Sequence, residues 1–272
     1  MTAPSAFARQ TWLISKTIWI EAIRRKEVYA IVAVAAALIG AARLVHFFDI
    51  EGLSKFYREA ALKTMNVATA LTVILLAARQ LPRELENRTI YPILAKPVAR
   101  GTFLVGKFLG VVAVAAFCYS LFMAIFIVGH ASTGAPLHWP LFAQSVYLQM
   151  WSFAAIAALT LMLSLLFNVD AAVTLAALLY LCSQVFMSLM SYIHDYLEIE
   201  QQRALLALHY IFPQLTLFDA SAKVVHSVPL ESGGWLWESL GAWAIVALTV
   251  YGFVYTALYL GLAHLMLRRR AF

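Results

Sequence analysis

Six long apolar runs constrain this chain more than any other feature of its sequence. They fall at about 28–48, 63–80, 102–129, 141–167, 171–193 and 236–266. A helix of roughly 20 apolar residues spans the hydrocarbon core of a bilayer, whereas an open sheet cannot satisfy its backbone hydrogen bonds there. The sequence therefore predicts an all-α integral membrane protein with six transmembrane helices. The 63–80 run is the weakest of the six, because polar residues bound it on both sides.

Composition supports this class and limits what else the chain can contain. Hydrophobic residues make up 63% of the 272 residues and charged residues 12%, against roughly 45–50% and 25% in soluble domains. Six spans leave no room for a separate soluble catalytic domain, so any ATPase must come from another chain. Cys118 and Cys182 both lie in apolar runs, where cysteine behaves as a small hydrophobic residue.

The distribution of Lys and Arg predicts the orientation. A net charge of +6 would suggest nucleic acid as a partner of a soluble protein, but in a membrane protein basic residues first report topology. We therefore expect no nucleic-acid partner. With both termini in the cytoplasm, fourteen of the twenty Lys and Arg residues lie on the cytoplasmic side: Arg9, Lys16, Arg24, Arg25, Lys26, Arg79, Arg83, Arg88, Lys96, Arg100, Lys107, Arg268, Arg269 and Arg270.

Outside the spans, the sequence predicts four further parts of one transmembrane domain. Residues 1–27 lack a signal-peptide pattern and have helical periodicity, with Phe7, Trp12, Ile18 and Trp19 on one arc. This pattern indicates a helix in the membrane interface; the alternative is a continuation of the first span. Spans one to five occupy 28–193, with a first outer loop at 49–62. A long extracytoplasmic connection with a helical segment covers 194–235, and a basic tail at 267–272 follows span six.

The stretch from Arg79 to Gly110 places six basic residues between two apolar runs. Pro82 suits the first turn of a helix, and Glu84, Glu86 and then Arg88 follow in the charge order that complements a helix dipole. Pro92 and Pro97 then break the backbone. We predict a short amphipathic cytoplasmic helix with a hinge, able to transmit force to two spans. The alternative is a helix that rests on anionic lipid.

Several patterns in the sequence resemble active or binding sites but have simpler explanations. Gly101, Gly106 and Lys107 match part of a phosphate-binding loop, but Phe108 stands where Ser or Thr must hold magnesium. We expect instead that Gly106 and Gly110 let another helix approach closely and that Lys107 anchors its helix at the cytoplasmic surface.

His194 and Glu198 could supply two metal ligands, but the spacing of the sequence fixes no third ligand, and we predict no metal site. An intramembrane hydrolase would need a reactive group in mid-span. The polar span residues are better explained by interhelical hydrogen bonds: Ser152, Thr160, Ser164, Thr174, Ser183 and Gln184.

At ENRTIYPILAKPVARGTFLVGKFLG, from Glu86 to Gly110, the chain resembles the permease subunits of ABC transporters of the type-2 exporter class. The shared pattern is an acidic residue, Arg-Thr, a hydrophobic stretch, Pro with a small residue and Arg, and a Gly-Lys pair that opens the next span. The FPQLTLFD run from Phe212 to Asp219 is similar, more loosely, to a stretch before the last span. That stretch contains Pro and Asp and is found in permeases of the kind that includes copper-site maturation and gliding-motility exporters.

This resemblance implies a non-catalytic permease subunit in a prokaryotic inner membrane. It implies a coupling helix between spans two and three, formed here by Arg83, Glu84, Glu86, Arg88 and Thr89, that seats in a separate ATPase subunit. The turn with Asn168 and Asp170 would be a second, smaller contact. ATP and magnesium would be bound by two ATPase copies, and two permeases would pair as a homodimer or close heterodimer. The apolar spans suit a lipid-like substrate or force transmission to an extracytoplasmic accessory protein. The alternative is a self-contained secondary transporter or a membrane scaffold.

Overall fold

The computed structural model describes residues 4–24, 26–44, 53–82, 99–131, 136–193, 200, 214–230 and 234–269, and most of them are helical. The long helices are α1 (Pro4–Arg24), α2 (Lys26–Leu44), α3 (Leu53–Gln80), α6 (Arg100–Ala131), α7 (Trp139–Leu166), α8 (Val169–Ile193) and α11 (Ala242–Arg269). A 3-10 turn, η3 (Leu215–Phe218), and the short α10 (Ser221–His226) precede α11. Extended pairing in these ranges is limited to a single bridge between Pro229 and Trp235. The predicted all-α class is confirmed for this part of the chain.

Four of these helices are long and apolar enough to cross a membrane: Lys55–Gln80, Arg100–Ala131, Trp139–Leu166 and Ala242–Arg269. A helix of 28 residues, such as α7, is roughly 42 Å long, which exceeds the hydrocarbon thickness of a bilayer. Within α8, residues Val169–Val185 form a shorter apolar helix. The chain is thus a multi-pass membrane protein, and the assignment of α2 and α8 as the remaining two spans stays a prediction.

The start of α3 differs from the sequence prediction. Residues 53–62 were expected in an outer loop, but α3 already begins at Leu53. This first part of the helix is amphipathic: Tyr57, Ala61 and Met65 are buried at a spacing of four residues, while Lys55 is exposed. The charged residues lower the hydropathy of the segment without breaking its helical periodicity, so hydropathy alone missed it.

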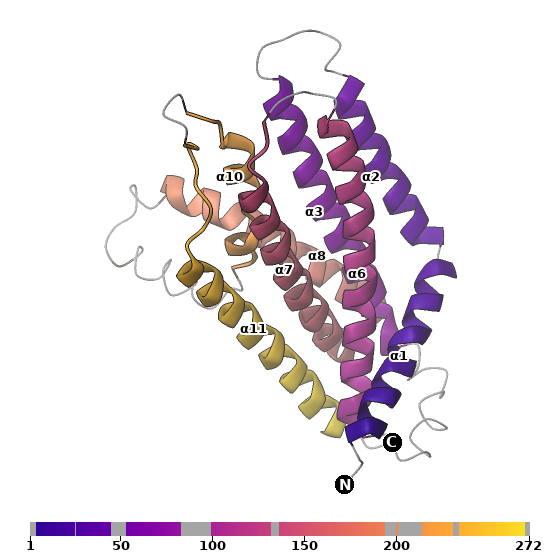
Figure 1. Ribbon diagram of the computed structural model, residues 1–272. Helices are drawn as coiled ribbons and strands as arrows, with labels where there is room; N and C mark the ends of the chain where they lie inside the picture. The colour runs from indigo at the N-terminus through magenta and orange to yellow at the C-terminus, as the bar shows by residue number, and fades with distance from the viewer. Residues whose placement is uncertain are drawn as a thin grey trace.

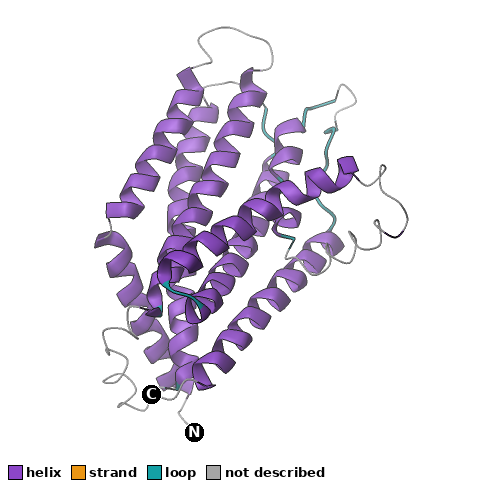
Figure 2. Cartoon of the chain, turned by 180° about the vertical axis from the view of Figure 1, so that it is seen from behind, coloured by secondary structure: helices purple, strands orange, loops and turns teal. Residues whose placement is uncertain are grey.

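The helices form one bundle with α7 and α3 at its centre (Figure 1). Among the four candidate spans α7 is the most deeply buried and α11 the least. α3 packs against α7, α6 and α2, whereas α11 packs mainly against α7. The view from behind (Figure 2) shows α8 crossing the bundle obliquely, where it contacts α7 and α3. α1 begins and α11 ends at the same end of the bundle, here called the near end, and the opposite end is called the far end.

α1 packs lengthwise along α6 instead of standing apart from the bundle. Thr11, Ile18 and Ala22 are buried, whereas Trp12 is exposed. The apolar residues of α1 are therefore divided between a face that contacts α6 and a face that points away from the protein. The sequence could not separate these faces, because both are apolar.

Candidate functional site at the anchors of the 83–98 segment

The residues predicted to form the coupling helix lie outside the described part of the chain: Arg83, Glu84, Glu86, Arg88 and Thr89. The two points where this segment joins the bundle are described. On one side α3 ends at Gln80 and is followed by Leu81 and Pro82; on the other, Ala99 leads into Arg100 at the start of α6. The candidate site is therefore built from these two anchors.

The first anchor is a polar cluster around Gln80, which is 2% exposed. The amide Nε2 of Gln80 donates a hydrogen bond to Oε2 of Glu21 on α1 (3.2 Å), and its Oε1 accepts one from Nζ of Lys107 on α6 (3.0 Å). Since an amide has one donating and one accepting end, this orientation is the one that suits both a carboxylate and an ammonium group. One side chain thus joins three helices where the 83–98 segment leaves α3.

Lys107 is only 4% exposed, which corrects the expectation that it anchors α6 at the membrane surface. Besides Gln80, its ammonium group lies over the ring of Phe103, 5.7 Å from the centroid. A buried charge is costly unless it is paired and hydrogen-bonded, and an aromatic face adds a favourable cation–π contact. Lys107 is therefore an interior contact between helices and not a headgroup anchor.

Close packing of α1 on α6 holds the Glu21 side of this cluster in place. A Cβ atom added at Gly106 would lie 2.9 Å from Ile14 Cβ, and one at Gly110 would lie 2.6 Å from Ile18 Cδ1. The prediction that these glycines allow close helix approach is confirmed, with α1 as the partner. Gly106 and Lys107 lie beyond the first turn of α6, where backbone N–H groups bond within the helix and cannot cradle a phosphate.

The second anchor is Arg100, the first residue of α6. Its Nη1 donates to the carbonyl oxygens of Leu267 (3.2 Å) and Arg268 (3.1 Å), in the last turn of α11. The final carbonyls of a helix have no partner within the helix and carry its negative dipole end, so a guanidinium group is a suitable cap. The other end of the 83–98 segment is thereby tied to α11.

The predicted second contact, Asn168 and Asp170, lies in the exposed turn between α7 and α8. Oδ1 of Asn168 accepts a hydrogen bond from the backbone N–H of Ala171 (3.2 Å), which is a helix N-cap interaction. Asp170 lies in the first turn of α8, where a carboxylate complements the dipole. Both residues have a structural role there, and contact with an ATPase stays a prediction.

A polar cluster in the half of the bundle toward the far end was not predicted as a unit. Nζ of Lys63 on α3 lies 2.9 Å from Oδ2 of Asp219, and Nδ2 of Asn66 donates to Oγ of Ser221 (3.1 Å). The hydroxyl of Tyr119 on α6 donates to Oδ1 of Asn66 (3.1 Å). Burial by itself would raise the pKa of Asp219, but hydrogen bonds from Ser221 and the charge of Lys63 outweigh it, so this pKa lies below its ordinary value. The cluster fastens η3 and α10 to α3.

The small hydroxyl residues in the spans mostly bond to their own helices. Thr160, Ser164 and Thr174 donate to carbonyl groups three or four residues earlier. Oγ of Ser183 instead accepts a hydrogen bond from the N–H of Leu215, outside its helix. The expectation of interhelical hydrogen bonds is thus wrong for the first three, because a helical hydroxyl can satisfy itself on the preceding turn.

The sequence does contain a signal for the clusters around Gln80 and Asp219, namely polar residues at the edges of apolar runs. Glu21, Gln80 and Lys107 each stand near the boundary of a predicted span, where an ionisable or amide side chain needs a partner. Sequence alone could not pair them, since they lie far apart along the chain.

No group of three or more His, Cys, Asp or Glu residues suited to a metal occurs among the described residues, and His194 and Glu198 lie outside them.

A comparison with protein families matches residues 12–271 to the ABC-2 family transporter protein family. The chain belongs to the ABC-2 transporter family. A search of curated proteins finds no match. Membership of the ABC-2 family identifies the chain as a membrane subunit, a permease component of an ABC transporter that pairs with an ABC ATPase subunit. The resemblance seen in the sequence is thereby confirmed at the level of the family.

Proposed function

We propose that this chain is the permease subunit of an ATP-driven ABC exporter, in which movement of a separate ATPase reaches the spans through residues 83–98. The observation that carries the proposal is the Gln80 amide, which joins α1, α3 and α6 at the point where this segment begins. Its neighbours Glu21 and Lys107 carry opposite charges. A displacement of the end of α3 would therefore be resisted by both and passed to two other helices.

The second anchor extends the path to α11. Arg100 follows the segment directly and caps the end of α11 through two carbonyl groups. The two ends of the segment are thus held by buried or capped polar contacts, so a displacement of either end would be passed to the helices that these contacts join. In the proposed mechanism, Arg83, Glu84, Glu86, Arg88 and Thr89 bind the ATPase, and Asn168 with Asp170 adds a smaller contact.

The proposed assembly follows the family. Two permeases, as a homodimer or close heterodimer, would work with two ATPases that bind ATP and magnesium. α2, α3, α6, α7, α8 and α11 would be the six spans in a prokaryotic inner membrane. The near end, with Arg24, Arg100, Arg268 and Arg269, would face the cytoplasm, in agreement with the positive-inside rule.

The proposed cargo is lipid-like or hydrophobic, or else the subunit transmits force to an extracytoplasmic partner. Part of the interior supports this choice, since α7 at the centre of the bundle buries a stretch from Phe153 to Leu161 with one hydroxyl group, Thr160, while the other buried polar residues of α7 lie outside that stretch: Ser145, Gln149, Ser152 and Ser164. Thr160 bonds to its own helix. A hydrophilic conduit would need polar side chains free to replace the hydration of its cargo.

The test substitutes Gln80 by Leu, which keeps the side-chain size and removes both hydrogen bonds. We expect Gln80→Leu to leave insertion and recovery of the ATPase intact but to reduce the effect of the permease on ATP hydrolysis by about tenfold, as loss of one buried charged hydrogen bond implies. The measurement is ATP hydrolysis by the co-purified complex in lipid vesicles.

Gln144 provides a matched control for this experiment. Its amide also makes two hydrogen bonds, to the N–H and the carbonyl of Leu240 at the start of α11, far from the anchors. Gln144→Leu should therefore leave coupling unchanged. Equal coupling in Gln80→Leu and the wild type would overturn the proposed path, as would equal losses in Gln80→Leu and Gln144→Leu.

A further inference from the structure

Arg58 is a buried cation on the interior face of α3, close to the far end of the bundle. The residue is only 4% exposed. It lies one turn before Leu62 and two turns before Met65, and both of these residues are buried in the hydrophobic core. The guanidinium group is therefore enclosed by protein and does not extend along the surface to water. A buried charge is costly unless it is paired and hydrogen-bonded.

The guanidinium group of Arg58 is held at one nitrogen and open along one edge. Nη1 donates a hydrogen bond to the carbonyl oxygen of Pro136 (3.2 Å), shortly before α7. Nε is buried and finds no acceptor in the described part of the chain, and Nη2 makes no hydrogen bond there either. The N–H groups of Nε and Nη2 are parallel donors that match two oxygens of one anion. The bond to Pro136 thus orients the group and leaves this edge unused.

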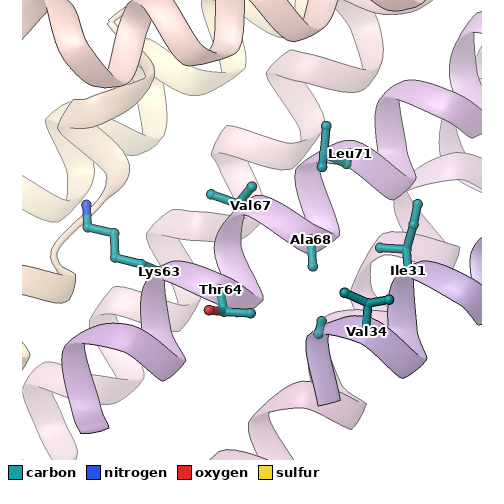
Figure 3. A pocket seen from close by; sticks show the side chains of 8 residues that line it. Ile31, Val34, Lys63, Thr64, Val67, Ala68 and Leu71 are labelled. Carbon is teal, nitrogen blue, oxygen red and sulfur yellow. The ribbon is translucent and has the colours of Figure 1, made fainter. Parts of the chain in front are cut away.

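The carboxylates of the ranges described above do not neutralise Arg58. Glu59 follows it directly but is exposed, and consecutive residues of a helix do not face the same way. Asp219 pairs with Lys63 at 2.9 Å. The Lys63 side chain extends away from the α2 side, where Ile31 and Val34 lie (Figure 3). One cation of α3 is therefore paired, whereas the charge of Arg58 requires an anion from elsewhere.

The level of Arg58 along the bundle favours phosphate as this anion. Its partner Pro136 lies three residues before Trp139, which begins α7 and is 55% exposed. Exposed Trp residues gather at the membrane–water interface, the depth of the lipid headgroups and their phosphates. His138 lies between Pro136 and Trp139, and its Nδ1 is a second buried nitrogen without a hydrogen-bond partner in the described structure.

We propose that the open Nε–Nη2 edge of Arg58 binds a phosphate group at the far end of the bundle, supplied by a phospholipid headgroup or by free phosphate. Two phosphate oxygens accept the two N–H donors, and the negative charge compensates the buried guanidinium group. Because Nε is enclosed, the phosphate enters while the 136–138 stretch is displaced from α3, so binding is slow. The site lies at the opposite end of the bundle from residues 83–98 and does not depend on the proposed ATPase contact.

The first test measures the Tm of the full-length chain, stripped of lipid in mild detergent, with inorganic phosphate or with potassium chloride at equal ionic strength. The Tm of the wild type should rise by about 5 °C when phosphate is present at about one hundred times its Kd. Arg58→Met keeps the side-chain length and should abolish the rise. Arg58→Lys keeps the charge without the planar pair of donors and should weaken binding by at least about tenfold.

Lys55 provides the matched control, since it is an exposed basic residue one turn before Arg58 on α3. Lys55→Met should respond to phosphate as the wild type does. Equal responses of the wild type and Arg58→Met would overturn the proposal.

A second measurement identifies the source of the phosphate. Native mass spectrometry compares retention of phosphatidylglycerol and of diacylglycerol with identical chains. A preference for the phospholipid that Arg58→Met loses identifies a headgroup as the ligand. A rise in Tm with inorganic phosphate but equal retention of the two lipids identifies free phosphate. A wild type that shows neither response would contradict the proposal.

Stability without phosphate separates this site from an arginine that only supports the fold. Replacing a buried charge that lacks a counter-charge by an apolar side chain of similar size is neutral or stabilising. In phosphate-free detergent Arg58→Met should therefore unfold at the same Tm as the wild type or at a higher one. A lower Tm of the variant under these conditions would show that Arg58 is already compensated within the protein, and the proposal would fail.

Discussion

At the scale of single residues, contact between α1 and α6 depends on two positions without a side chain. Gly106 and Gly110 face Ile14 and Ile18 at distances that leave no room for a Cβ atom. The neighbouring atoms are β-branched side chains, which have few alternative rotamers and cannot move aside easily. This close approach brings Glu21 within reach of Gln80.

Alanine at Gly110 should destabilise the protein. We expect Gly110→Ala to lower the free energy of unfolding by about 1–3 kcal/mol, because the added methyl group must displace Ile18 or shift α1. Thermal unfolding in detergent measures the effect. Gly261→Ala is the control, since Gly261 lies within α11 with open space around it and should be neutral or slightly stabilised. Equal stability of Gly110→Ala and the wild type would contradict the packing described for α1.

At the scale of elements, the segment with η3 and α10 is held to the bundle by short polar contacts at the far end. Gln214 and Leu215 donate backbone N–H groups to Tyr251 (3.2 Å) and Ser183 (3.0 Å), and Asp219 pairs with Lys63. These contacts come from three different helices. The segment should therefore loosen when one of them is removed.

The Asp219 carboxylate makes this attachment dependent on pH. Because its pKa is lower in the folded protein, the carboxylate stabilises the fold at pH values above about 4, and that contribution is lost as the pH falls through the folded-state pKa. Lys63 is half exposed, so we expect Asp219→Asn to cost about 1 kcal/mol at pH 7, or roughly 2–4 °C in Tm.

Measuring the Tm of Asp219→Asn and the wild type at pH 7 and pH 3 tests this account. The difference should shrink at the lower pH, since pH 3 lies below the ordinary pKa of about 3.9 that the aspartate has in the unfolded chain, so the unfolded state then binds the proton more readily than the folded state. Glu238→Gln, at an exposed acidic position before α11, serves as the control. A difference that is as large at pH 3 as at pH 7 would show that the charge of Asp219 has no part in the attachment.

Much of the element pattern could be predicted from the sequence, because hydropathy and helical periodicity act locally. The apolar runs at 102–129 and 141–167 correspond to α6 and α7 within a few residues. The early start of α3 at Leu53 was missed, since charged residues on its exposed face masked the helix. The pairing of Gln80 with Glu21 and Lys107 was also missed, because it depends on the crossing of three helices and not on spacing along the chain.

At the scale of the whole molecule, the charged contacts of the described residues lie toward the two ends of an apolar bundle. Glu21, Gln80, Lys107 and Arg100 gather toward the near end, and the Lys63–Asp219 pair joins α3 to the segment with η3 and α10 toward the far end. Between them the described helices pack mainly through apolar side chains. Asn66, near the middle of α3, adds uncharged hydrogen bonds with Ser221 and Tyr119. A bundle whose described charged contacts lie away from its middle can change the tilt of its helices without exposing buried charge there, which suits a subunit moved from outside.

The central claim is that a separate ATPase acts on this bundle through residues 83–98, and charge reversal in that segment tests it most directly. The full-length chain and the variant Glu84→Lys/Glu86→Lys are purified in mild detergent with the ATPase that accompanies them, and ATP hydrolysis is measured in vesicles. We expect normal membrane insertion of the variant, with loss of ATPase recovery or of the permease effect on hydrolysis. Recovery and hydrolysis equal to the wild type would contradict the assignment.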